Sequence, residues 1–97
     1  MDGIILTDKG NQLLDYMQKN DRVFVGKDLI DLTGIQGIYP VFNSLVKKGL
    51  VIQGGLEIRN FTNKEGKTFP KEYKTYSLTD MGRAYQIMAN IIVTKQN

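Results

Sequence analysis

The amino-acid sequence predicts a small α+β domain, and three observations lead to this prediction. The chain has 97 residues, which suits a single compact domain over residues 1–97 and excludes a multidomain enzyme. Apolar residues recur at helical spacing near both ends and in the middle of the chain. Between the middle and last of these segments, the pattern alternates as it does in strands. We therefore expect helices packed beside a β-hairpin.

The first two predicted helices flank a short strand. Thr7 is typical of a helix N-cap, and apolar residues recur at helical spacing from there to Met17. The segment 22–25 is β-branched and aromatic, which favours a small strand. A second helix is expected over about 27–33, where Gly34 ends it in a left-handed conformation and leads into a tight turn.

The third predicted helix runs from about residue 37 to residue 48. Pro40 fits in its first turn, because the amides there have no partner within the helix. The helical repeat places one apolar face on Ile38, Val41, Phe42 and Leu45. The opposite face is polar and carries Pro40, Asn43, Ser44 and Lys47.

The next part of the chain predicts a β-hairpin. Residues 50–59 alternate as a strand, and the pair Gly54–Gly55 within them suggests a bulge or bend. Residues 60–71 are rich in turn formers, which predicts a loop. Residues 73–78 alternate again and are expected to return as the partner strand.

A last helix follows the hairpin. Thr79 and Asp80 are expected to cap it. Its core-like spacing involves Met81, Ala84, Tyr85, Met88 and Ile91. Ile92 and Val93 extend the apolar content beyond what one small core needs, so we hypothesise a homodimer through this C-terminal helix.

This order of elements is the layout of a winged helix-turn-helix domain, with a three-helix core, a β-hairpin wing and a C-terminal helix. The segment Gly37-Ile-Tyr-Pro-Val-Phe-Asn-Ser-Leu-Val-Lys-Lys-Gly-Leu-Val51 resembles the recognition-helix stretch of PadR-like transcriptional regulators. Tyr76-Ser-Leu-Thr-Asp-Met-Gly-Arg83 is similar to the element that closes the wing in PadR-like and MarR-like proteins. Together with Val25-Gly-Lys-Asp-Leu29, the resemblance spans about residues 22–90.

The resemblance implies a transcriptional regulator that binds double-stranded DNA. The third helix, about 37–48, would lie in the major groove, and the basic wing, about 56–75, would follow the flanking phosphates. Amide side chains can read adenine edges, whereas lysines supply affinity without sequence information. The candidate DNA-binding residues are Gln36, Pro40, Asn43, Ser44, Lys47, Lys48, Arg59, Lys64, Lys67, Lys71 and Lys74. Aromatic and apolar neighbours are instead expected to serve packing, namely Tyr39, Phe42, Leu45, Tyr73, Tyr76 and Tyr85.

Charge is unevenly distributed along the chain. Residues 1–35 carry four bases and six acids, whereas residues 36–97 carry nine bases and four acids. A phosphate-facing surface shows this asymmetry, but so does an ordinary solvated surface, and Glu65 and Glu72 interrupt the wing lysines. Function as a winged-helix module that binds protein, in a transcription or replication assembly, therefore stays open as the alternative.

Cysteine and histidine are both absent from the sequence, and their absence excludes several kinds of chemistry. With no Cys and no His, the chain has no disulfide, no thiolate or imidazole metal site and no histidine-dependent nucleophile. Carboxylate or Ser/Lys chemistry is left in principle, but Ser44 and Ser77 lie in no nucleophile motif and no acid–base constellation is visible. We therefore discount a small enzyme, which a deep pocket lined by converging carboxylates would revive, and expect no metal or other cofactor. The amino-terminal segment lacks the bases of a signal peptide, and no apolar run approaches the roughly 20 residues that a bilayer requires. We expect a cytoplasmic protein without a membrane partner.

Overall fold

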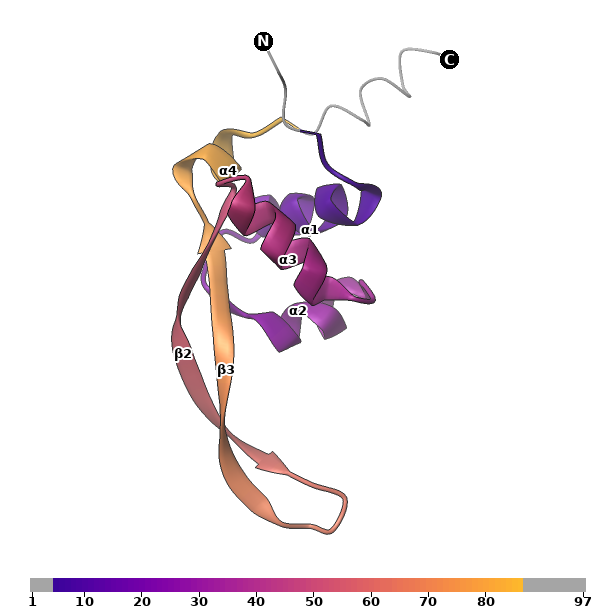
Figure 1. The fold of residues 1–97 in the computed structure, drawn as a ribbon, viewed down its shortest axis with the longest axis vertical. Coiled ribbons are helices and arrows are strands. Elements are labelled where there is room, and N and C mark those ends of the chain that lie inside the picture. The colour runs from indigo at the N-terminus through magenta and orange to yellow at the C-terminus, as the bar shows by residue number, and fades with distance from the viewer. Residues whose placement is uncertain (1–4, 87–97) are drawn as a thin grey trace.

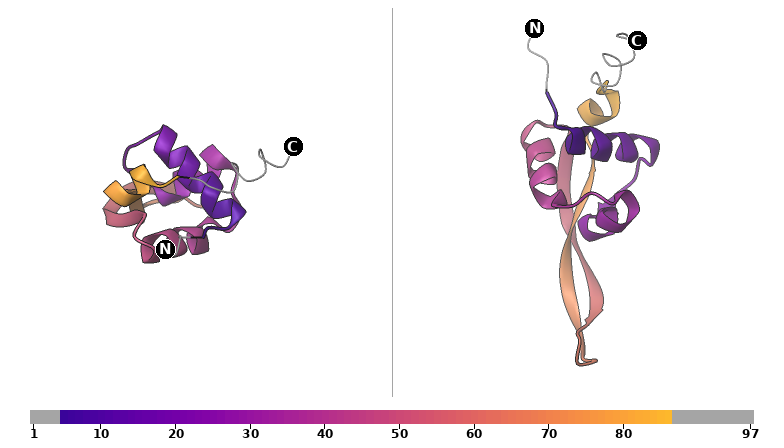
Figure 2. Two further views of the ribbon diagram at one scale, coloured as in Figure 1. Left: turned by 90° about the horizontal axis from the view of Figure 1, so that it is seen from above. Right: turned by 90° about the vertical axis from the view of Figure 1, so that its right-hand side faces the viewer.

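A computed structural model describes residues 5–86 of the chain and has an α+β architecture. Within these residues, the helices form a body from which a long hairpin projects (Figure 1), and the view turned about the vertical axis shows the same separation (Figure 2, right). In chain order, the elements are α1 (Asp8–Lys19), β1 (Phe24–Val25), α2 (Gly26–Thr33), α3 (Ile38–Lys47), β2 (Val51–Thr62), β3 (Thr68–Leu78) and α4 (Asp80–Ala84).

The first three helices lie close to their predicted positions. Thr7 caps α1 as expected, because its Oγ1 accepts a hydrogen bond from the amide of Gly10 at 3.1 Å. Gly34 and Gly37 bound the tight turn between α2 and α3, with φ of 73° and 65°. Residues that carry a side chain rarely adopt this left-handed backbone conformation, which explains why glycine occupies both positions. Ile35 lies buried between them and anchors the turn to the core.

The hydrophobic core lies between the helices and the base of the sheet. The predicted apolar face of α3 is confirmed, since Ile38, Val41, Phe42 and Leu45 are all buried. The ring of Phe42 stacks on that of Tyr76 from β3, with centroids 3.9 Å apart and planes 4° apart. Leu13, Leu14 and Met17 of α1 complete this part of the core.

The sheet is antiparallel, with the strand order β1-β3-β2. β1 pairs with β3 only through Phe24 opposite Tyr76 and Val25 opposite Thr75, so it is shorter than the predicted strand over 22–25. β2 pairs with β3 along its length, except where the register shifts between Gln53 and Leu56. This irregularity confirms the bulge predicted at Gly54–Gly55.

The predicted loop over residues 60–71 is wrong, because both strands of the hairpin continue into it. β2 extends to Thr62 and β3 begins at Thr68, which leaves a turn of only residues 63–67. The rings of Phe61 and Phe69 meet edge to face across the ladder, which favours continued pairing. Pro70 fits the strand because β1 does not reach it, so its missing amide interrupts no ladder on that side.

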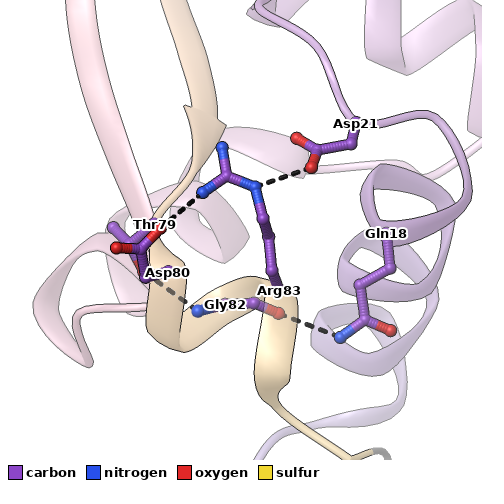
Figure 3. Close-up of polar contacts among 6 residues, drawn as sticks. All are labelled: Gln18, Asp21, Thr79, Asp80, Gly82 and Arg83. Carbon is purple, nitrogen blue, oxygen red and sulfur yellow. Dashed lines mark hydrogen bonds and ion pairs between the residues drawn. The ribbon is translucent and has the colours of Figure 1, made fainter.

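The last predicted helix was expected to continue to Ile91, and within the described residues this is wrong, because α4 ends at Ala84 and Tyr85 is extended, with ψ of 131°. Gln18 of α1 explains this end, because its Nε2 donates a hydrogen bond to the backbone oxygen of Gly82 at 2.9 Å (Figure 3). The same Nε2 donates a second hydrogen bond to the backbone oxygen of Tyr85 at 2.7 Å. Met81 is exposed at this end and not part of the core. The rest of the predicted dimer helix, including Met88, Ile91, Ile92 and Val93, lies outside the described residues.

The N-terminal end of α4 agrees with the prediction. Thr79 caps the helix by accepting a hydrogen bond from the amide of Gly82 at 3.0 Å (Figure 3). Arg83 bridges Asp21 and Asp80, which joins α4 to the segment that follows α1. This short helix is therefore tied both to α1, through Gln18, and to the segment that follows α1, through Asp21.

Candidate functional site

A groove of about 360 Å³ lies between α3 and β3, and it brings together three of the predicted site residues. Asn43 lines it from α3, and Lys71 and Lys74 line it from β3. The other lining residues are Tyr39, Glu72, Tyr73 and Tyr76. The groove therefore combines one amide and two ammonium groups with aromatic rings, and its lining carries only one carboxylate.

The aromatic residues of the groove differ in how far they are buried. Tyr76 is almost fully buried and is both a groove residue and a core residue. Burial raises the pKa of the Tyr76 phenol, and its charge interaction with Tyr39 adds to the effect. The Tyr76 hydroxyl therefore remains protonated at neutral pH. Gly26 lies under these rings, since a Cβ there would be 2.9 Å from Tyr76 Cε2 and 3.3 Å from Tyr39 Cε1.

Tyr39 corrects one of the packing predictions. It was expected in the core with Phe42 and Leu45, but its side chain is 41% exposed and lines the groove. At about 100° per residue, position 39 lies at the flank of the apolar face centred near Phe42 and Leu45. The helical repeat therefore contained the signal that would have placed Tyr39 at the edge of the core.

The remaining predicted residues of α3 lie in different surroundings. Pro40 and Lys47 are exposed on the outer surface of the helix. Ser44 is half-buried and accepts a hydrogen bond from Lys48 Nζ at 2.8 Å, so these two side chains interact with each other. Gln36 is exposed in the turn before α3, and its backbone oxygen accepts a hydrogen bond from Lys9 Nζ at 2.8 Å.

The tip of the hairpin presents two of the predicted lysines. Asn63 organises the turn, because its Oδ1 accepts hydrogen bonds from the amides of Glu65 and Lys67 at 2.9 and 3.0 Å. Lys64 and Lys67 are exposed in this turn. The tip therefore has a defined backbone that carries two cations, which lie in the turn and not among the residues that line the groove.

One face of the hairpin carries a row of aromatic and cationic side chains. Arg59 and Phe61 of β2 lie opposite Lys71 and Phe69 of β3. The Nζ of Lys71 lies 4.8 Å from the ring centroid of Phe61 and 5.6 Å from that of Tyr73. These cation–π contacts hold the Lys71 side chain along the strand, where it lines the groove.

Arg59 is already engaged within the protein. Its Nη1 and Nη2 donate to the two carboxylate oxygens of Asp28 in α2, at 2.7 and 2.8 Å, and its Nε donates to Glu57 at 2.6 Å. The hydrogen bonds from Arg59 hold the pKa of the Asp28 carboxyl below its usual range, whereas burial opposes the shift. Its two carboxylate partners also raise the pKa of Arg59. Arg59 thus differs from the lysines of the hairpin, whose charges face solvent or aromatic rings.

Sequence reasoning missed two contributors to the site besides Tyr39. Lys27, in the first turn of α2, places its Nζ 5.2 Å from the ring centroid of Tyr73. Tyr73 was expected to serve packing only, but it is partly exposed and lines the groove. No local pattern in the sequence could have revealed the contact between Lys27 and Tyr73, because 46 positions separate these two residues.

Other surface features are less concentrated. A second hollow of about 370 Å³ lies between α1 and α2, lined by Gln12, Asp15, Tyr16, Lys19, Leu32 and Thr33. Ile52, Leu56 and Ile58 of β2 are more than half exposed, at 54%, 54% and 65%. Among the described residues, no carboxylate cluster could hold a metal ion. None of the helices in residues 5–86 has the length and apolar character needed to span a bilayer.

Comparison with known proteins provides no further assignment: no protein-family model matches the chain, and no curated protein shows significant similarity to it.

Proposed function

We propose that this protein is a winged-helix DNA-binding protein that regulates transcription, in which α3 reads bases and the β2–β3 hairpin contacts the backbone. The observation that carries the proposal is the groove in which Asn43 of α3 meets Lys71 and Lys74 of β3. Amide side chains can read base edges, and lysines can contact phosphates. In a winged helix, the recognition helix and the hairpin supply these two kinds of contact, and here they correspond to α3 and the β2–β3 hairpin.

The surroundings of the groove add support to this proposal. Asn43 is exposed, so its amide is free to pair with the edge of an adenine in the major groove. Lys64, Lys67, Lys71 and Lys74 place four ammonium groups along the hairpin, from its tip to the groove. We assign Asn43 to base recognition and these lysines to phosphates. Because Arg59 is paired with two carboxylates, we give it no phosphate contact.

Salt dependence tests the phosphate contacts. We expect a fluorescent mixed-sequence duplex to bind with an affinity that falls steeply with salt concentration in an anisotropy titration. Lys74→Gln should reduce the log–log slope by about 0.9, because one phosphate contact is lost. Lys19→Gln makes the same charge change at the end of α1 and should leave the slope nearly unchanged. Equal slopes for both variants would argue against a phosphate contact at the groove. If no duplex binds at low salt, the proposed function is refuted.

A test of base recognition needs a DNA duplex of selected sequence. We expect Asn43→Ala to bind a duplex that the unsubstituted protein has selected from a random pool more weakly than the unsubstituted protein does. The expected loss of binding free energy is about 1–3 kcal/mol, which is the discrimination that a good bidentate pair provides. The same variant should bind the unselected pool almost normally, because phosphate contacts dominate that binding. Equal losses on both duplexes would show that Asn43 does not read bases.

A protein-binding module is the second candidate function, and the aliphatic side chains of β2 favour it. Leu56 and Ile58 leave more than half of their surface exposed, and they share one face of the hairpin because they lie opposite Lys74 and Glu72. Ile52 is exposed on the other face, opposite Ser77. Exposed apolar side chains that lie together are typical of contact surfaces for other proteins. Under this alternative, the anisotropy titration stays flat at low salt, and Ile58→Ser weakens binding to the partner.

A further inference from the structure

The distal hairpin receives little backbone support from the rest of the protein. β1 pairs with β3 only at Tyr76 and Thr75, so from Lys74 to the tip the backbone of β3 pairs with β2 alone. A two-stranded ribbon twists and bends more readily than a wider sheet. The direction of the hairpin relative to the helices therefore depends on side-chain contacts.

Two contacts of this kind come from the first turn of α2, and they reach both strands. Asp28 accepts two hydrogen bonds from Arg59 on β2, at 2.7 and 2.8 Å. The adjacent Lys27 places its ammonium 5.2 Å from the ring centroid of Tyr73 on β3. One turn of helix thus holds the hairpin at two neighbouring points.

The contact between Asp28 and Arg59 is the more directional of the two. A guanidinium that donates two parallel hydrogen bonds to one carboxylate fixes the angle of approach as well as the distance. The Nε of Arg59 also donates to Glu57 at 2.6 Å, which orients the guanidinium from its other side. Arg59 lies directly opposite Lys71 in the strand register, so holding Arg59 also places Lys71 at the groove.

We infer that the Asp28–Arg59 ion pair is a positioning contact that sets the direction of the hairpin relative to α3, and thereby determines which DNA sequences the protein selects. This inference rests on the proposed function. Phosphate contacts set the register and orientation of a protein on a duplex, so a hairpin held in one direction limits the bases that Asn43 can reach.

Charge and position predict different effects for one substitution. Asp28→Asn removes a negative charge and one of the two carboxylate partners of Arg59, so electrostatics alone predicts tighter binding to every duplex and an unchanged ratio between duplexes. If the ion pair positions the hairpin, the same variant binds its selected duplex less well relative to the random pool. Asp31→Asn is the matched control, because it removes the same charge from an exposed position of the same helix. Asp28→Glu keeps the carboxylate and should restore part of the selectivity.

Distance measurements test the inference without DNA. The chain contains no cysteine, so Gln12→Cys on α1 and Glu65→Cys at the tip provide two unique positions for spin labels. Both residues are exposed. We expect a narrow distance distribution between the labels in the otherwise unsubstituted protein and in Asp31→Asn. Asp28→Asn should broaden or shift the distribution, and an unchanged distribution would overturn the inference.

Binding measurements test the second half of the inference. The probes are a duplex selected by the unsubstituted protein and the random duplex pool, and the readout is the ratio of the two affinities. We expect Asp28→Asn to lower this ratio by roughly threefold or more, and Asp31→Asn to leave it unchanged. If Asp28→Asn changes the distance distribution but leaves the affinity ratio unchanged, only the link between the ion pair and DNA selectivity is overturned. Failure of the unsubstituted protein to bind any duplex would overturn the proposed function and this inference together.

Discussion

At the scale of single residues, Gly82 shows how closely two backbones approach in this small fold. A Cβ at this position would lie 1.9 Å from the backbone oxygen of Leu50 and 2.9 Å from its carbonyl carbon. The same Leu50 oxygen accepts a hydrogen bond from the amide of Thr79 at 3.1 Å. The contact is therefore between backbones, which cannot give way as a flexible side chain can.

We predict that Gly82→Ala destabilises the protein, by about 1–3 kcal/mol or more, as is usual for an overpacked interior. Chemical denaturation followed by circular dichroism measures the loss. Gly55→Ala is the control, since a Cβ at Gly55 would meet nothing within 4 Å. Similar losses in the two variants would show that the approach to Leu50 is not the cause.

Single residues also show what local patterns can reveal. The helical repeat correctly predicted that Asn43 is exposed and that Phe42 is buried, because both follow from the period of one helix. The engagement of Arg59 could not be predicted in this way, because Asp28 lies 31 positions earlier in the chain. In the sequence, Arg59 is one more base of a basic segment, and only the packing of α2 against the hairpin distinguishes it from the lysines.

At the scale of elements, the hairpin was predicted but its length was not. The turn formers between residues 60 and 71 favoured a loop, yet the cross-strand contact between Phe61 and Phe69 extends the ladder. The end of α4 has a similar cause, since Gln18 of α1 binds two backbone oxygens at its end. Element boundaries were wrong where a partner distant in the sequence determines them.

The ion pair between α2 and β2 makes one part of the stability depend on pH. Arg59, and more weakly the charges of Lys27 and Arg22, hold the pKa of Asp28 below its ordinary value of 3.8. A carboxyl whose pKa is lowered by folding contributes stability above its unfolded pKa, and this contribution disappears as the pH falls through the folded pKa.

We therefore predict that Asp28→Asn is less stable than the unsubstituted protein at pH 7, and that the difference shrinks below about pH 4. The difference at pH 7 should stay below about 1 kcal/mol, because both side chains are more than a third exposed. Urea titrations at several pH values measure it. A difference that stays constant down to pH 2 would show that protonation of Asp28 does not cause it.

At the scale of the whole molecule, the hairpin carries a slightly larger excess of positive charge than the helices that precede it. Residues 51–78 hold five bases and three acids, whereas residues 5–50 hold six bases and five acids. The lysines Lys64, Lys67, Lys71 and Lys74 follow the hairpin. The order of elements and the overall α+β class followed from periodicity and turn residues. The groove did not, because it forms only where α3 and β3 come together.

The predicted homodimer also belongs to this scale, and it rests on apolar residues from Met88 onward, which lie outside the described residues. We expect sedimentation at micromolar concentrations to show a dimer, and Ile91→Asp to shift it toward monomer, because a charge in an apolar interface is costly. Asn90→Asp is the control, because it introduces the same charge at a polar position next to Ile91, about 100° away around the predicted helix. Monomer alone in the unsubstituted protein would contradict the homodimer.

The aromatic lining of the groove has a spectroscopic consequence. The chain has no tryptophan, so its five tyrosines dominate the intrinsic ultraviolet emission, and Tyr39, Tyr73 and Tyr76 all line the groove. A molecule that enters the groove alters the surroundings of three of the five emitters, whereas one that occupies the hollow between α1 and α2 meets only Tyr16. The protein thus carries its own reporter, and the extent of quenching distinguishes the two surfaces without an added dye.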